Sequence, residues 1–276
     1  MASRIIGIIA GNGVYPETFA RAARTSGEDI QLVAAAFTGE TKPEFTEEVD
    51  VIQWFKVGQL GKMIKFFVEQ GVTETIMVGQ ISPNNLFNFR PDLRTIAVLA
   101  RLKERNAESL FGAIGEELSK EGMPLISAIT FLEEGLAKSG HMYGPKLKDQ
   151  AAYDAEYGFK IAKESSRLDI GQSVIVREGT VLAVEAFEGT NACIARGGKL
   201  GREKNVTLAK VSKPNQDFRF DVPVIGPQTI EKCKQSGVRQ IAIETGCTLI
   251  LDPTRVAELC NKLKITVVGL SSDTAS

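Results

Sequence analysis

The sequence predicts an α/β protein: a Rossmann-like N-terminal domain with a parallel sheet, followed by a second α/β domain with a mixed sheet. Three observations support this fold class. Apolar runs of strand length alternate with helical stretches in the first half, and the first run ends in a Gly-x-Gly loop. The second half has shorter strands before the α/β alternation returns. Continuous apolar strands separated by helices are typical of parallel sheets covered on both faces.

The first domain is expected to span residues 1–130. Apolar runs predict strands at residues 4–10, 30–36, 51–55 and 75–79, with a short one near 124–127. Apolar residues at helical spacing predict helices at residues 16–24, 58–70, 93–104 and 108–120. The stretch 131–150 is polar and rich in Gly and Lys, so we expect it to be a linker.

The second domain is expected to span residues 151–276 and to open with a helix at about 149–166. Further helices are predicted at 190–195, 228–235 and 254–262. Strands are predicted at 173–177, 180–185, 206–211, 240–244, 248–251 and 265–268.

Composition excludes several classes of protein. The net charge of -1 shows no basic excess, which argues against a nucleic-acid partner. The four cysteines form no C-x-x-C pair, so reduced thiols are expected, and a lone His141 offers little for a catalytic triad. No apolar run approaches the roughly 20 residues of a spanning helix, and no signal peptide is evident. We expect a cytoplasmic protein whose membrane contact, if any, is peripheral at the inner membrane.

Two glycine loops predict a site for a phosphate-bearing ligand. The first strand ends in Gly11-Asn12-Gly13, and Pro16 stands where a dinucleotide fingerprint has its third glycine. The fourth strand ends in a second loop, and no acidic residue closes the second strand, which argues against NAD. Glycines selected only for tight turns remain the alternative. The expected binding residues here are Gly11, Asn12, Gly13, Gly79 and Gln80.

The densest group of candidate catalytic side chains lies between Arg167 and Asp252. Glu185 and Glu188 precede Thr190 and Asn191, at the end of a predicted strand. A second group lies between Pro214 and Pro223. If its residues 217–221 are extended, their charged side chains share one side of the strand and the phenylalanines the other. That group consists of Asp217, Arg219 and Asp221, and Lys213 directly precedes Pro214.

Carboxylates beside cations suit phosphoryl chemistry. Carboxylates bind Mg²⁺ or Mn²⁺ or orient water, while Arg and Lys neutralise phosphate oxygens. The alternative is a solvated edge strand with ion pairs along it. We expect metal ligation by Asp221, Glu185 and Glu188, and catalytic roles for Asp221, Asp217, Arg219 and Lys213.

Six segments in chain order resemble the LpxI family of UDP-2,3-diacylglucosamine pyrophosphatases. They are residues 7–16, 57–62, 167–172, 182–190, 213–223 and 243–246. The resemblance implies a first domain for UDP, a second domain for the acylated sugar phosphate, a divalent metal and a homodimer. It also implies that the family's essential aspartate is Asp221. The family usually has Asp where this chain has Asn191, and a neutral amide binds a metal less strongly than a carboxylate does.

The expected reaction is the hydrolysis of UDP-2,3-diacylglucosamine to UMP and 2,3-diacylglucosamine 1-phosphate. Asp221 would be a metal ligand or the base that positions water, with Thr190 and Asn191 at the substrate. Because the acidic group is assigned to the second domain, water is expected to attack the phosphorus attached to the sugar. Two alternatives remain: a hydrolase or transferase acting on another UDP-sugar, and a nucleotide-sensing regulatory protein.

Overall fold

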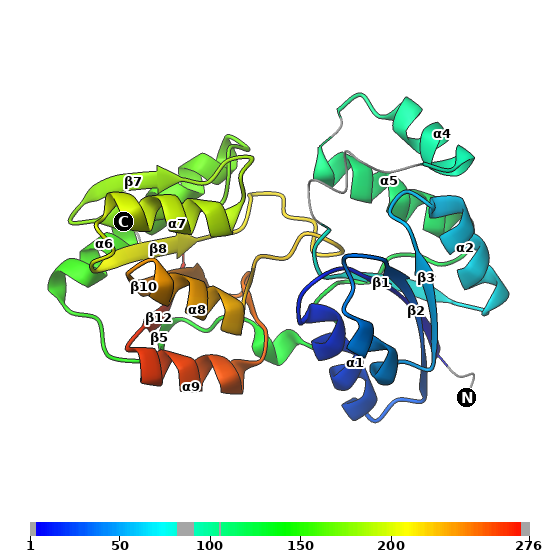
Figure 1. The fold of residues 1–276 in the computed structure, drawn as a ribbon, viewed down its shortest axis with the longest axis horizontal. Coiled ribbons are helices and arrows are strands. Elements are labelled where there is room, and N and C mark those ends of the chain that lie inside the picture. The colour runs from blue at the N-terminus through cyan, green and yellow to red at the C-terminus, as the bar shows by residue number, and fades with distance from the viewer. Residues whose placement is uncertain (1–3, 82–90, 105, 272–276) are drawn as a thin grey trace. The chain divides into compact units, whose positions relative to one another are not determined.

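The computed structural model describes residues 4–81, 91–104 and 106–271, which form two compact units. The first unit contains the described residues up to Leu132 together with Asp217–Asp221. The second contains Glu133–Gln216 and the described residues from Val222 onward. Each unit has its own sheet, one parallel and one mixed (Figure 1). The predicted fold class is confirmed.

The sheet of the first unit consists of four parallel strands in the order β3-β2-β1-β4. Of the two central strands, β2 is buried in all but one residue and β1 in its middle, as apolar runs covered on both faces should be. Parallel strands have their carboxyl ends at one edge, so the loops after β1 and β4 are neighbours. The strands are β1 (Arg4–Ala10), β2 (Ile30–Phe37), β3 (Val51–Phe55) and β4 (Glu74–Val78).

Helices cover both faces of this sheet (Figure 1). Val33 and Ala35 of β2 belong to a core that contains Phe67 of α2 and Leu118 of α5. Because side chains alternate along a strand, the intervening residues of β2 point to the opposite face. The helical segments are α1 (Tyr15–Thr25), η1 (Pro43–Glu48), α2 (Leu60–Glu69), α4 (Leu93–Arg101) and α5 (Ala107–Lys120).

The second unit has a six-stranded sheet in the order β5-β12-β10-β8-β6-β7. Strands β8, β10 and β12 are parallel to one another, while β5, β6 and β7 each run antiparallel to a neighbour. The strands are β5 (Gly140–Tyr143), β6 (Ser173–Arg177), β7 (Thr180–Val184), β8 (Val206–Lys210), β10 (Val238–Glu244) and β12 (Thr266–Leu270). A separate two-stranded sheet pairs β9 (Val224–Ile225) with β11 (Leu249–Ile250).

Alternation along β6 shows how this sheet is covered. Val174 and Val176 pack against Phe159 of α6, while Ile175 packs in the core that contains Ile194 of α7. Helices α7, α8 and α9 therefore lie on one face and α6 on the other (Figure 1). The helical segments are η2 (Glu133–Gly135), α6 (Asp149–Arg167), α7 (Thr190–Leu200), α8 (Pro227–Gln235) and α9 (Pro253–Leu263).

Two local predictions were wrong. The expected linker contains β5, which pairs with β12 and adds an edge strand to the sheet. The expected strand at 124–127 is reduced to a single bridge between Thr75 and Leu125. An edge strand pairs with a neighbouring strand on one side only and is exposed on the other, so its own sequence can be polar. None of the described helices is long and apolar enough to cross a membrane.

Glu117 connects α5 to α4 through an ionic cluster around its buried carboxylate. Its carboxylate accepts hydrogen bonds from Lys120 Nζ at 2.7 Å, Arg101 Nη2 at 2.7 Å and Arg94 Nε at 2.8 Å. The Glu117 residue is 6% exposed. Hydrogen bonds from Lys120, Arg101 and Arg94, in that order of size, lower its pKa from 4.5 to about 2. A carboxylate stabilised in this way contributes to folding only while it is ionised.

Glu117→Gln is expected to lower the free energy of unfolding of the first unit by about 2 kcal/mol at neutral pH. The figure follows from roughly 1.4 kcal/mol per unit of pKa shift, reduced because Arg101 and Lys120 are half-exposed. The difference from wild type should be complete above pH 4.5 and disappear as the pH falls toward about 2. Urea unfolding followed by the fluorescence of Trp54, the single tryptophan, reports this unit selectively. A pH-independent difference would show that the ionic cluster does not stabilise the unit.

Candidate functional site

The two glycine loops of the first unit lie against each other at the carboxyl edge of the sheet. The Asn12 N–H donates to the Gln80 carbonyl at 2.7 Å, and the Gln80 N–H donates back to the Asn12 carbonyl at 3.1 Å. A Cβ atom on Gly11 would lie 2.6 Å from the Gln80 carbonyl oxygen, and one on Gly79 would lie 2.7 Å from the Asn12 carbonyl oxygen. Gly11 and Gly79 are therefore required by the contact between the loops themselves.

Gly13 differs from these two glycines. Its φ is +98°, a conformation that favours glycine, and a Cβ atom there would meet nothing within 4 Å. The space beside Gly13 is thus open, directly before the start of α1. Asn12 and Gln80 are exposed at the same edge. The amino end of a helix next to exposed backbone can receive an anion, so Gly13 is the loop glycine best placed for a phosphate.

The carboxyl edge of the second sheet holds a buried carboxylate. Glu185 follows β7, is 8% exposed, and accepts a hydrogen bond from Thr190 Oγ1 at 2.8 Å through Oε1. Its Oε2 is buried and has no hydrogen-bond partner among the described residues. Ser173, at the start of β6, lies 3.4 Å from Thr190 through their hydroxyl oxygens. A buried carboxylate oxygen without a partner is costly, which marks Glu185 as a candidate ligand-binding group.

Glu188 makes contacts of a different kind. Its carboxylate pairs with Arg196 of α7 and accepts the Ala186 N–H at 3.2 Å. The hydrogen bond from Arg196 is the largest cause that lowers the pKa of Glu188. This carboxylate therefore stabilises the start of α7, and both of its oxygens already have protein partners.

The segment Asp217–Asp221 is a turn and not the extended strand that we expected. The N–H groups of Phe220 and Asp221 both donate to the Asp217 carbonyl, at 3.2 and 2.9 Å. The Arg219 N–H donates to Asp217 Oδ1 at 3.0 Å, an arrangement that competes with strand pairing. The predicted strand alternation, which would place Asp217, Arg219 and Asp221 on one side, therefore does not apply.

This turn groups with the first unit, although the sequence assigned its acidic residues to the second domain. The Ala128 N–H donates to the Phe218 carbonyl at 2.8 Å. The Phe220 ring packs against Phe111 of α5, with centroids 6.0 Å apart. These contacts attach Asp221, which is partly buried, to the Rossmann-like unit.

Arg219 and Lys213, the two basic residues expected at the site, already pair with carboxylates. Arg219 Nη2 lies 2.6 Å from Asp217 Oδ2, and this partner is the largest cause that lowers the pKa of Asp217. Lys213, in the second unit, pairs with Asp169 at 2.5 Å. Both pairs are partly exposed, so a phosphate could exchange with the carboxylate at little cost.

One buried network was not recognised in the sequence. Lys163 Nζ of α6 donates to Glu244 Oε1 at 2.8 Å, and Ser212 donates to Glu244 Oε2 through both its N–H and its hydroxyl, at 2.7 Å each. Glu244 is 7% exposed and ends β10. Lys163 and Glu244 are 81 residues apart, so no local spacing connects them.

The described residues contain no group of three or more His, Cys, Asp or Glu side chains arranged to hold a metal ion. Of the expected ligands, Glu185 and Glu188 belong to the second unit and Asp221 to the first. Of these three expected ligands, Glu185 is the one that has a buried oxygen without a hydrogen-bond partner among the described residues. The residues of each unit alone therefore do not fit a Mg²⁺ or Mn²⁺ site, which needs several oxygen ligands.

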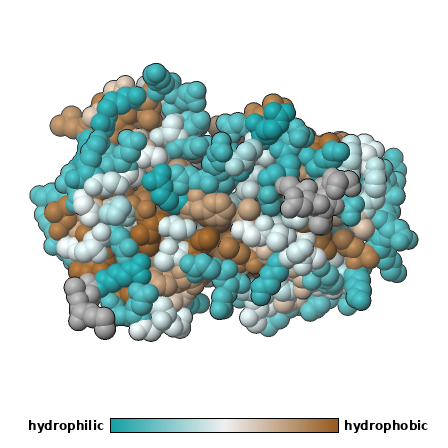
Figure 2. Space-filling view, turned by 180° about the vertical axis from the view of Figure 1, so that it is seen from behind, coloured by the Kyte–Doolittle hydropathy of each residue, from teal (hydrophilic) through white to brown (hydrophobic). Residues whose placement is uncertain are grey.

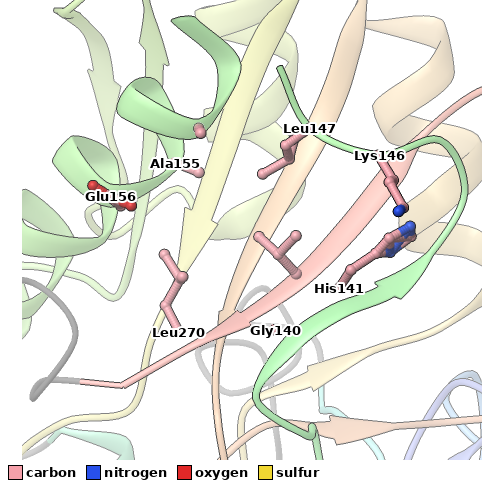
Figure 3. Close-up of a pocket in the computed structure, with 9 residues that line it drawn as sticks. Gly140, His141, Lys146, Leu147, Ala155, Glu156 and Leu270 are labelled. Atoms are coloured by element: carbon pink, nitrogen blue, oxygen red, sulfur yellow. The ribbon is translucent and has the colours of Figure 1, made fainter. Parts of the chain in front are cut away.

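A hollow of about 300 Å³ lies on the face of the second sheet next to α6. Figure 3 shows the side chains of His141 and Lys146 close together on one lip and Glu156 on the opposite side. Val268 and Leu270 of β12 form part of its apolar floor. His141, for which the sequence predicted no role in a triad, thus lies on the edge strand β5 at this hollow. His141, Lys146 and Glu156 are all exposed.

Two family models match the chain. The LpxI N-terminal domain matches residues 5–135, and the LpxI C-terminal domain matches residues 138–268. The UDP-2,3-diacylglucosamine pyrophosphatase LpxI of Caulobacter vibrioides is 29% identical over 278 residues, which is 97% of this chain and 98% of that protein.

Solved structures show less similarity. CobK precorrin-6A reductase has a TM-score of 0.33 and 10% identity, with 97% of this chain and 88% of that chain covered. The dCMP deaminase of cyanophage S-TIM5 has a TM-score of 0.26 and 14% identity, with 42% of this chain and 96% of that chain covered. These scores are too low for an inference about fold or function.

Lys163→Met is expected to destabilise the second unit by about 3 kcal/mol, because it leaves Glu244 buried without its cation. Lys160→Met is the matched control, since Lys160 lies on the same helix and is exposed. Urea unfolding followed by far-ultraviolet circular dichroism measures both. Equal stability of the two variants would contradict a structural role for the buried pair.

Proposed function

Because the chain belongs to the LpxI family, we propose that it hydrolyses UDP-2,3-diacylglucosamine to UMP and 2,3-diacylglucosamine 1-phosphate in lipid A biosynthesis. The observation that carries this proposal is the extent of the likeness. Both units match a domain of the family, and the Caulobacter relative, whose name states that substrate, aligns over 97% of this chain.

Asp221 is proposed as the group that orients and deprotonates the attacking water. The family resemblance supports this role, and so does its attachment to the unit with the open Gly13 loop. A carboxylate within hydrogen-bond reach of a water can accept its proton as the oxygen attacks phosphorus. The P–O bond of the bridging oxygen then breaks, and UMP leaves with that oxygen.

Arg219 and Lys213 are proposed to neutralise charge on the pyrophosphate oxygens. Each pairs with a carboxylate in the present structure, and each pair is partly exposed. A diphosphate carries more charge than one carboxylate, so it can compete for either cation. Asp217 then serves to position Arg219 through the same hydrogen bonds that close the turn.

UDP is proposed to bind the first unit at the Gly11–Gly13 and Gly79 loops, with a phosphate beside Gly13. The open backbone there and the adjacent start of α1 support this placement. Thr190 and Asn191, at the start of α7, are proposed to bind the sugar part together with Glu185.

A requirement for Mg²⁺ or Mn²⁺ is carried over from the resemblance as a prediction. The roles proposed for Asp221, Arg219 and Lys213 do not depend on the metal, because neither unit alone presents a sufficient set of ligands among the described residues.

We also propose, from the family resemblance, that the enzyme is a cytoplasmic homodimer with peripheral contact with the inner membrane. Apolar side chains interrupt the hydrophilic surface in several places (Figure 2). Among the described residues, Leu93 of α4 and Phe187 are the most exposed large apolar side chains.

The first functional test is release of UMP from UDP-2,3-diacylglucosamine by the full chain, with UDP-N-acetylglucosamine as the non-lipid comparison. Asp221→Asn is expected to reduce turnover by on the order of 10²–10⁴, the usual effect of losing a catalytic base. Binding of UMP, measured by calorimetry, should change little. A chelator should abolish turnover, and added Mg²⁺ or Mn²⁺ should restore it.

Asp29→Asn is the matched control, because Asp29 is exposed and precedes β2 at the opposite edge of the sheet. Turnover of Asp221→Asn within about tenfold of wild type would remove Asp221 from the mechanism. Equal turnover of UDP-N-acetylglucosamine would instead indicate an enzyme for another UDP-sugar.

Hydrolysis in ¹⁸O-labelled water is expected to place the label in 2,3-diacylglucosamine 1-phosphate. Asp221 was expected in the second domain, next to the sugar phosphate, but it groups with the first unit, which removes one reason for this direction. The direction therefore rests on the family resemblance. Mass spectrometry of both products measures it, and label in UMP would show that water attacks the phosphorus attached to uridine.

A further inference from the structure

The first unit contains an apolar cavity that the proposed mechanism does not use. It has a volume of about 100 Å³ and lies between the carboxyl part of the sheet and the helices α2, α4 and α5. Several of its apolar side chains are only partly buried. Its lining includes Ile9, Phe37, Met63, Met77, Phe111 and Ile114.

The polar side chains that line this cavity, Gln59 and Thr95, make hydrogen bonds within the protein. Gln59 Oε1 accepts the Lys56 N–H at 2.9 Å. Thr95 Oγ1 donates to the Gly58 carbonyl at 2.6 Å and accepts the Leu60 N–H at 3.3 Å. A nucleobase or sugar would lose its hydration there and find few polar side chains to replace the water, which is unfavourable. A hydrocarbon has no such cost.

The size of the cavity also fits a hydrocarbon. An apolar cavity of about 150 Å³ engineered in another protein stays dry and binds benzene. The present volume is of the same order, so it can receive part of a single hydrocarbon chain. Each methylene moved from water into such a cavity raises affinity about fourfold.

The cavity shares a wall with the segment that carries Asp221. Phe111 lines the cavity, and its ring packs against Phe220, the residue before Asp221. The loop after β4 connects the cavity to the glycine loops, because Ile81 lines the cavity and Gln80 pairs with Asn12. All of these residues belong to the first unit.

We propose that this cavity binds the end of one acyl chain of the substrate. The proposal rests on the proposed function, which supplies a substrate with two hydrocarbon chains. It assigns an acyl chain to the first unit, whereas the resemblance suggested that the second unit takes the whole acylated sugar. The hollow beside His141 is a weaker candidate, because Lys146 and Glu156 at its edges are exposed and charged (Figure 3).

The test changes the cavity in opposite directions at Ile114, which lines it from α5. Ile114→Phe reduces the space, so kcat/KM for a longer acyl chain should fall relative to a shorter one by about fourfold for each methylene excluded. Ile114→Ala enlarges the space and should shift the preference toward longer chains. Damage to the fold alone cannot move this ratio in both directions.

Val68→Phe is the matched control, because Val68 lies on α2, is 50% exposed and does not line the cavity. It should keep the wild-type preference. An unchanged chain-length ratio in both Ile114 variants would overturn the proposal, and so would a shift in the same direction in both.

A second measurement does not depend on turnover. A fatty acid with a photoreactive group at its terminal carbon, cross-linked to the full chain, should label peptides that contain Met63 or Ile114. Label confined to peptides around Leu147 and Ala155, or displacement of the label by UMP, would overturn the assignment. If the wild type releases no UMP from the lipid substrate, the proposed function fails, and labelling at Ile114 still decides whether the cavity binds hydrocarbon.

Discussion

Two contacts of one short turn, the hydrogen bond from the Ala128 amide to the Phe218 carbonyl and the packing of Phe220 on Phe111, attach Asp221 to the first unit. Together they hold a five-residue turn on the first unit, although the chain on both sides belongs to the second. The chain thus passes between the units three times. A single amide–carbonyl bond contributes only about 1 kcal/mol, so the buried part of the Phe220 ring is the larger part of this attachment.

Most of the fold could be predicted because nearly every central strand is buried on both faces. In such strands apolar side chains are continuous, as in Ile30–Phe37 and Val206–Lys210, and the intervening helices have one apolar face. The edge strand Gly140–Tyr143 could not be predicted in this way. Its residues are exposed or half-buried, and its place depends on pairing with β12, more than 120 residues later. Local sequence contains no signal for a partner at that distance.

The candidate site was only partly predictable. The two glycine loops do lie together, but Gly11 and Gly79 are explained by their mutual contact rather than by a ligand. Glu185 and Thr190 meet because they are five residues apart across a strand–helix junction. The turn at Asp217 was missed because the Asp217 side chain accepts the Arg219 N–H, a local bond that alternation of polar and apolar residues does not reveal.

The Phe111–Phe220 contact gives the apolar cavity a connection to the chemistry. A chain that fills the cavity would pack against Phe111 from one side while Phe220 packs against it from another, which restricts both rings. Restricting Phe220 also restricts the turn that ends at Asp221. In that turn the N–H groups of Phe220 and Asp221 both donate to the Asp217 carbonyl. Binding energy from a part of the substrate that does not react could then be used to orient the carboxylate that does. In this arrangement the acyl chain contributes to positioning as well as to affinity, and a truncated substrate would lose turnover as well as binding.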